Sequence, residues 1–194
     1  QMALRKVQRK SSQFLLALLG FLIIFTGCWD RNELDNLAIV IGSALDHEHD
    51  GQYRFSVQFV KPSAMGAGGG SGGSQSGQGS SPSVTIVSSG RTIYEASVAV
   101  NSHFSRRPFW SHMQIVLIGE GIAKKGLFEI IDQFDRAAET RNTVLLAVAK
   151  DAPASDILTM QGKMEDIPAM ALIKKLQYGE LSSFTEEVTL RDFA

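Results

Sequence analysis

The sequence has one cysteine and five prolines in 194 residues, and its charges of opposite sign nearly cancel. One cysteine cannot close an intramolecular disulfide, nor can it supply the ligands of a Cys-rich zinc module. The 19 basic and 20 acidic side chains leave a net charge of −1. This balance argues against a nucleic-acid binder, which would normally show a strongly basic stripe. The length allows one domain and the start of a second.

The N-terminus has no apolar run long enough to span a bilayer. The run Phe14–Gly27 has 14 residues, and as a helix it would be about 21 Å long against a hydrocarbon core of ~30 Å. The residues before it are basic and include no acid: Arg5, Lys6, Arg9 and Lys10. A basic stretch followed by a short apolar run predicts a signal peptide, residues 1–27.

The only cysteine, Cys28, follows directly after the small residues Thr26 and Gly27. The segment Phe25–Cys28 resembles a bacterial lipobox, with Phe25 where such sites prefer Leu. We therefore predict cleavage between Gly27 and Cys28, and lipidation of Cys28 by an S-diacylglyceryl group and an N-terminal acyl chain. One acyl chain binds a membrane only marginally, but two chains give lasting attachment at ~0.8 kcal/mol per buried CH₂. An ordinary secretory signal and an uncleaved N-terminal anchor remain as alternatives.

The next segments predict an antiparallel hairpin. Residues 37–45 are rich in β-branched residues and are typical of a buried strand. Asp50-Gly51 is a strong turn signal. Residues 52–60 then alternate between apolar and polar side chains, which predicts a strand with one covered face.

The second half predicts a β-α-β unit. The apolar segments 113–119 and 143–149 flank residues 120–140, where Leu127 and Phe134 belong to one apolar helical stripe. Such a unit has parallel strands and a right-handed crossover. Together these patterns predict an α+β fold, a mostly antiparallel sheet with one β-α-β crossover, flanked by helices.

The composition of residues 28–194 indicates how this part of the chain is organised. Residues 64–83 are almost entirely Gly, Ser and Gln without charge, which predicts a disordered loop. We expect an N-terminal α/β domain over residues 28–180. Residues 181–194 are expected to begin a second, truncated domain.

The histidines do not predict a catalytic or metal site. His47 and His49 could share a strand face and hold a metal, but a site needs at least a third ligand, and a solvated hairpin tip fits them better. Ser111 and His112 are adjacent, so in a strand they would point to opposite faces. We therefore expect no catalytic residue, no metal and no cofactor, and the chain is predicted not to be an enzyme.

Arg106, Arg107 and Trp110 form a candidate partner surface, because cations beside aromatic rings suit an anionic or aromatic partner. The alternative interpretation is an exposed loop with one aromatic ring packed beneath it. By elimination, the residues indicate an interaction domain held at a membrane.

The sequence resembles the Ger(x)C family, the C subunits of bacterial spore germinant receptors. The resemblance rests on motifs whose order and spacing match: residues 27–34 (GCWDRNEL), 37–41, 53–62 (YRFSVQFVKP), 90–92, 95–96, 109–114 (FWSHMQ), 119–120 and 136–141. It implies a protein of three α/β domains and about twice this length, of which this chain is the N-terminal part.

The resemblance also implies a function. It implies a lipoprotein on the outer face of the inner spore membrane that assembles with integral-membrane A and B subunits and is needed for the response to nutrient germinants. It implies no catalytic residue, and direct binding of a germinant stays open. An exported, lipid-tagged small-ligand-binding domain or hydrolase is the alternative.

Overall fold

The computed structural model describes residues 37–48, 50–61, 81–103, 105–137, 139–160, 165–181 and 187–193. These residues all belong to one unit, Asn36–Ala194. The predicted signal peptide, Gly27, Cys28, His49 and most of the predicted loop 64–83 lie outside the described residues, so the predictions on them stay predictions.

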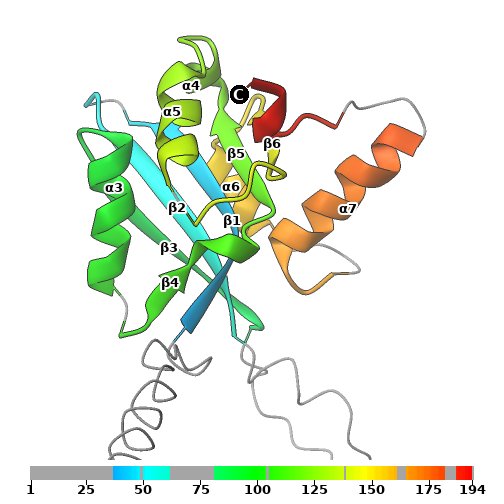
Figure 1. Ribbon diagram of the computed structural model, residues 1–194, viewed down its shortest axis with the longest axis horizontal. Helices are drawn as coiled ribbons and strands as arrows, with labels where there is room; N and C mark the ends of the chain where they lie inside the picture. The colour runs from blue at the N-terminus through cyan, green and yellow to red at the C-terminus, as the bar shows by residue number, and fades with distance from the viewer. Residues whose placement is uncertain are drawn as a thin grey trace, which may run out of the picture. The chain divides into compact units, whose positions relative to one another are not determined.

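The described strands form one six-stranded mixed sheet (Figure 1). Its order is β3-β2-β1-β5-β6, and β4 pairs with the first residues of β1. The β1–β2 and β2–β3 pairs are antiparallel, whereas β1–β4, β1–β5 and β5–β6 are parallel. The α+β class is confirmed, with more parallel pairing than expected. The strands are β1 (Leu37–His47), β2 (Tyr53–Val60), β3 (Ser83–Gly90), β4 (Arg107–Phe109), β5 (Ile115–Gly119) and β6 (Leu145–Ala149).

Helices cover both faces of this sheet. On one face lie α3, α4 and α5, and on the other lie α6 and α7. The helices are α3 (Ile93–Ala99), α4 (Glu120–Ala123), α5 (Phe128–Arg136), α6 (Ala154–Thr159) and α7 (Pro168–Leu181), with the 3₁₀ turns η3 (Val100–His103), η4 (Trp110–His112) and η5 (Leu190–Phe193).

The predicted hairpin between β1 and β2 is confirmed. Gly51 has φ +86°, a left-handed conformation that favours glycine. The backbone N–H of Gln52 donates to Asp50 Oδ1 at 3.0 Å, and the N–H of Glu48 donates to the carbonyl of Gln52 at 2.8 Å. These bonds close the turn that Asp50-Gly51 predicts.

The expectation that this hairpin has one covered face is wrong. Phe55, Val57 and Phe59 face the core under α3 and α5, as expected. Ser56 and Gln58 point to the other face and are buried there as well. The reason is that α6 and α7 pack on the second face, over a separate core that includes Leu158.

One predicted helix, residues 120–140, is two helices, α4 and α5. Gly126 between them has φ +113°, which no right-handed helix accommodates. Ile130 and Phe134 on α5 are buried as expected, and Leu127 and Ile131 pack partly buried beside them. The crossover from β5 through α4 and α5 to a parallel β6 is confirmed.

The C-terminal part differs from the expectation in its last helix. Pro168 and Gly179 in the sequence predict a helix that opens at Pro168 and ends before Gly179. Instead, α7 continues through Gly179 to Leu181, because a helix tolerates an internal glycine at a cost of ~1 kcal/mol. Residues 187–193 lie along β6: the N–H of Leu146 donates to the carbonyl of Val188 at 2.8 Å, and the side chain of Leu190 is buried. A second domain beginning at residues 181–194 stays a prediction.

Candidate functional site

A cleft of about 690 Å³ opens at one end of the sheet. Its walls come from the end of β1, the hairpin turn, the start of β2, the β5–α4 junction and the loop before α6. Since β1, β5 and β6 are parallel, their carboxyl ends meet at this edge. In α/β sheets, ligands bind preferentially at such an edge, which makes this cleft the candidate site.

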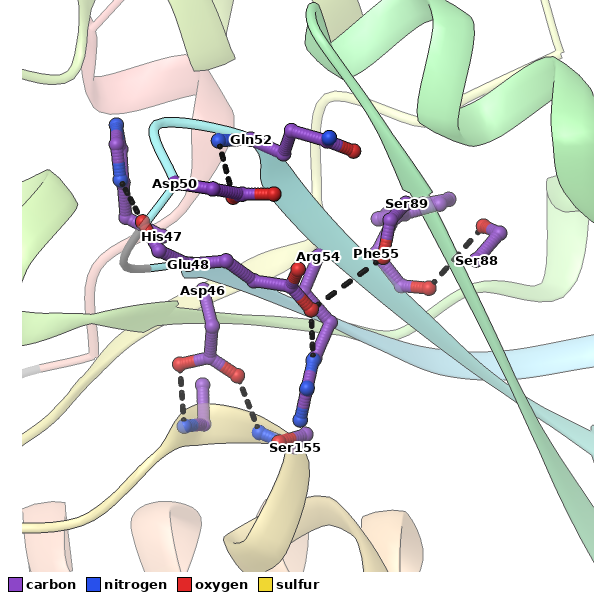
Figure 2. A network of polar contacts seen from close by, with 11 residues as sticks. Asp46, His47, Glu48, Asp50, Gln52, Arg54, Phe55, Ser88, Ser89 and Ser155 are labelled. Carbon is purple, nitrogen blue, oxygen red and sulfur yellow. Dashed lines mark hydrogen bonds and ion pairs between the residues drawn. The ribbon is translucent and has the colours of Figure 1, made fainter.

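Asp46, near the end of β1, holds the beginning of α6. Its Oδ1 accepts a hydrogen bond from the N–H of Ala154 at 2.7 Å, and its Oδ2 accepts one from the N–H of Ser155 at 2.8 Å (Figure 2). Pro153, the residue at the N-cap of α6, makes no side-chain capping bond. A carboxylate at the first N–H groups of a helix satisfies donors that have no partner inside the helix. Asp46 therefore caps α6 from a different element.

Gly119 makes room for this carboxylate. A Cβ atom at Gly119 would lie 2.6 Å from Asp46 Oδ1 and 3.2 Å from the carbonyl oxygen of Leu45. Any side chain here would push Asp46 away from α6.

Glu48 and Arg54 form the second contact of the cleft, across the hairpin. Glu48 Oε1 lies 2.7 Å from Arg54 Nε, and Figure 2 shows the two side chains meeting. Ser89 of the adjacent strand β3 also donates to Glu48 Oε1, at 3.4 Å. The bond to Glu48 raises the pKa of Arg54 above its usual range. This contact ties the three antiparallel strands together at the edge of the cleft.

Glu120 begins α4 on the opposite wall. Its carboxylate lies 2.6 Å from Lys124 Nζ. The hydrogen bond to Lys124, together with one from the backbone of Asp151, lowers the pKa of Glu120. Asp151 has φ +61° in the loop after β6. The loop is thereby joined to α4.

Four acidic residues of the cleft form hydrogen bonds within the domain. Asp46, Glu48, Asp50 and Glu120 each accept a hydrogen bond from within the domain. Among the described residues, no group of three or more His, Cys, Asp or Glu side chains could hold a metal ion. These hydrogen bonds stabilise this edge of the sheet. The described side chains of the cleft do not form a pair of groups placed for acid–base catalysis. The sequence predicts Glu120 as an acidic residue at the start of a helix, and α4 does begin at Glu120. Sequence reasoning missed the capping role of Asp46, although an acidic residue directly after an apolar strand was a usable signal.

Replacing Asp46 with Ala is expected to lower the free energy of unfolding by about 1–2 kcal/mol, because the first N–H groups of α6 lose their acceptor. Urea denaturation followed by circular dichroism measures the change. Asp132→Ala is the matched control, since Asp132 pairs with Arg136 on an exposed helix turn, and loss of such a pair should cost about 0.5 kcal/mol or less. Equal effects of the two substitutions would contradict the capping role.

The three residues predicted as a partner surface lie near the start of β1. Arg107 on β4 pairs with Leu37 in the sheet, and its guanidinium forms an ion pair with Glu139. Trp110 stacks on Phe55 with ring centroids 6.1 Å apart, and it packs against the core. Arg106 is exposed and has no ion-pair partner in the described part of the chain. Their role as a partner surface stays a prediction.

The other sequence candidates do not come together as sites. His47 Nδ1 lies 3.0 Å from the carbonyl oxygen of Glu48, and its Nε2 lies 3.1 Å from Lys125 Nζ. Ser111 and His112 lie in η4, a 3₁₀ turn just before the segment 113–119 that was predicted as a strand. The ring of His112 packs edge-on against Phe109 at 5.4 Å. None of the described helices combines the length and apolar character needed to cross a bilayer.

Comparison with known proteins identifies the class. Residues 30–194 match the family described as the spore germination protein N-terminal domain. The chain belongs to this family, and the predicted resemblance to spore germination proteins is confirmed.

Three relatives from Bacillus subtilis (strain 168) illustrate the similarity. Spore germination protein KC is 35% identical over 170 residues, which cover 86% of this chain and 41% of that protein. Putative spore germination protein YfkR is 37% identical over 147 residues, 76% of this chain and 37% of that protein. Spore germination protein YndF is 30% identical over 187 residues, 87% of this chain and 45% of that protein. The chain spans about two fifths of the length of these relatives. No solved structure matches it significantly.

Proposed function

We propose that the chain is the N-terminal domain of a lipid-anchored subunit of a spore germinant receptor, which acts through protein contacts and not through catalysis. The observation that carries this proposal is the family match over residues 30–194. The cleft supports a non-catalytic role, because Asp46, Glu48 and Glu120 are already hydrogen-bonded within the domain.

The length of chain before β1 supports a position close to the membrane. Cys28, the proposed lipid attachment site, lies nine residues before Leu37. Nine extended residues reach at most about 30 Å. The start of β1 would then lie within that distance of the outer face of the inner spore membrane.

The candidate partner surface lies at this same end of β1. Strand β4, which carries Arg107, pairs with Leu37–Ile39. Arg106, exposed beside it, can reach a partner that projects from the membrane. We propose the integral-membrane A and B subunits as these partners. Pull-down of the tagged protein from spore membranes tests this, and recovery of no polytopic subunit would contradict it.

Changing Cys28 to Ala is expected to release the protein from spore membranes and to impair nutrient-triggered germination, because no acyl chains can then be attached. Membrane fractionation with immunoblotting measures the first effect, and loss of spore refractility measures the second. Ser12→Ala, upstream of the apolar run, is the control and should leave both unchanged.

Unchanged membrane retention and germination in Cys28→Ala would contradict the proposed anchor. The alternative, an exported small-ligand-binding domain, makes a different prediction: saturable binding of an amino acid or sugar. Calorimetric titration of the protein with such compounds separates the two, and we expect a flat titration.

A further inference from the structure

Strand β3 ends the sheet on the side opposite β6, so one of its edges has no neighbouring strand among the described residues (Figure 1). The hydrogen-bond alternation of the antiparallel β2–β3 ladder shows which backbone groups face this edge. The N–H of Lys61 donates to the carbonyl of Pro82 at 2.7 Å, directly beyond the pair Val60 and Ser83. Odd residues of β2 therefore bond to even residues of β3.

The β1–β2 ladder confirms this assignment independently. The N–H of Glu48 donates to the carbonyl of Gln52. The backbone groups of even residues of β2 therefore bond to β1, and those of odd residues of β2 bond to β3. The N–H and C=O groups of the odd-numbered residues of β3 consequently point outward. These residues are Ser83, Thr85, Val87 and Ser89. No described residue forms a backbone hydrogen bond with them at this edge.

The edge also lacks the features that usually prevent strands from pairing. Natural edge strands carry charged residues, prolines or bulges, or are very short. The segment Ser83–Gly90 has eight residues, none of them charged or proline. It pairs with β2 residue for residue, without a bulge, and the side chain of Val87 is 46% exposed. This edge is suited to accept another extended strand.

The outward residues of β3 are nearly symmetric in sequence: Ser83, Thr85, Val87 and Ser89. We propose that β3 pairs with β3 of a second copy of this chain, antiparallel about a two-fold axis at Ile86. In this register, Ser83 lies opposite Ser89 of the second copy, and Thr85 lies opposite Val87. All four outward residues form hydrogen-bonded pairs in this register, and the sheet continues from one copy into the other.

The chemistry of the strand favours a second copy as its partner. Like charges placed opposite each other destabilise a strand pair, whereas β-branched pairs stabilise it. An uncharged strand with β-branched residues at its centre meets both conditions when it pairs with itself. The pairing is smaller than a standard interface of ~1,600 Å², so we expect an association that depends on protein concentration. The proposal does not depend on lipid anchoring or on a role in germination.

Cysteine cross-linking tests the register. In the Cys28→Ser full-length protein, in detergent, Ile86→Cys places two thiols in a non-hydrogen-bonded pair, where Cα atoms lie ~4.5 Å apart, close enough for a disulfide. We expect Ile86→Cys to form a disulfide-linked dimer at least about tenfold faster than two controls. Val84→Cys tests the register, because Val84 would face Ser88 of the second copy. Val98→Cys tests chance collision, because Val98 is exposed on α3.

Proline substitution tests the edge itself. The N–H of Val87 points outward, so Val87→Pro removes a donor of the dimer and leaves the β2–β3 ladder intact. We expect sedimentation equilibrium to show a dimer for the wild type at concentrations on the order of 100 μM, and a monomer for Val87→Pro with its circular dichroism spectrum unchanged. If Val87→Pro does not fold, Val87→Lys should give the same shift by charge repulsion.

Three results would overturn the proposal: a wild type that stays monomeric over this range, a dimer that Val87→Pro and Val87→Lys leave intact, or equal cross-linking of Ile86→Cys and Val98→Cys.

Discussion

Replacing Gln58 with Leu is expected to lower the free energy of unfolding by about 2–4 kcal/mol, because the change leaves buried backbone groups without partners. Gln58 lies on β2 and is 1% exposed. Its Nε2 donates to the carbonyl of Leu158 at 3.1 Å and to Thr85 Oγ1 at 3.2 Å. Its Oε1 accepts from the N–H of Ala169 at 2.9 Å.

These bonds join four elements through one side chain. Leu158 belongs to α6, Ala169 lies in the first turn of α7, and Thr85 lies on β3. Leu158 and Ala169 are fully buried, so water cannot replace the lost bonds without opening the core. Leucine is similar in size to glutamine. The loss of stability in Gln58→Leu therefore comes mainly from the lost hydrogen bonds and not from a change in side-chain volume.

Urea denaturation measures this change in stability. The matched control is Gln177→Leu, because Gln177 is exposed on α7 and its substitution should change the free energy of unfolding by about 0.5 kcal/mol or less. If the Gln58→Leu protein is as stable as this control, the hydrogen bonds to α6 and α7 make no net contribution to the free energy of unfolding.

Replacing Gly90 with Ala is expected to cost about 2–3 kcal/mol, because the new methyl group meets a helix backbone and not a flexible side chain. A Cβ atom at Gly90 would lie 2.5 Å from the backbone N of Ala96 and 3.0 Å from the Cα of Ala96. Helix α3 would have to move away from the end of β3. That movement would also stretch the 2.7 Å hydrogen bond from Ser88 Oγ to the carbonyl of Ala96.

The control for this prediction is Gly121→Ala. Gly121 lies in α4, and a Cβ atom there has no atom within 4 Å. Because alanine favours a helix over glycine by up to ~1 kcal/mol, this variant should be as stable as the wild type or more so. Thermal unfolding of the two variants should therefore move in opposite directions, and a Gly90→Ala protein with an unchanged melting temperature would contradict the close packing of α3.

Several elements could be predicted from the sequence because their signals are local. Asp50-Gly51 predicts the β1–β2 turn, and Gly51 adopts the left-handed conformation that this turn requires. Thr92 with Glu95 predicts the start of α3. The structure confirms it, since Thr92 Oγ1 accepts from the N–H of Glu95 at 3.1 Å. In each case the residues that make the signal also make the contact.

Other features could not be predicted in this way. Gly126 divides the predicted helix over residues 120–140, although helices often contain a glycine, as α7 contains Gly179. The difference is the positive φ of Gly126, which depends on how α4 and α5 pack on the sheet. The second covered face of the hairpin was missed because Ser56 and Gln58 are polar, and their burial depends on α6 and α7, about 100 residues further along the chain.

By itself, the sequence determined the membership in the spore germination family, the hairpin and the β-α-β unit, and it singles out Cys28 as the proposed anchor. Only the tertiary structure decided that Asp46 caps α6, that Gln58 joins four elements, and that the outer edge of β3 has no neighbouring strand among the described residues. The physical reason is the range of the interactions. Turns and caps form between residues close in sequence, whereas strand order and helix packing bring together residues up to about 110 positions apart.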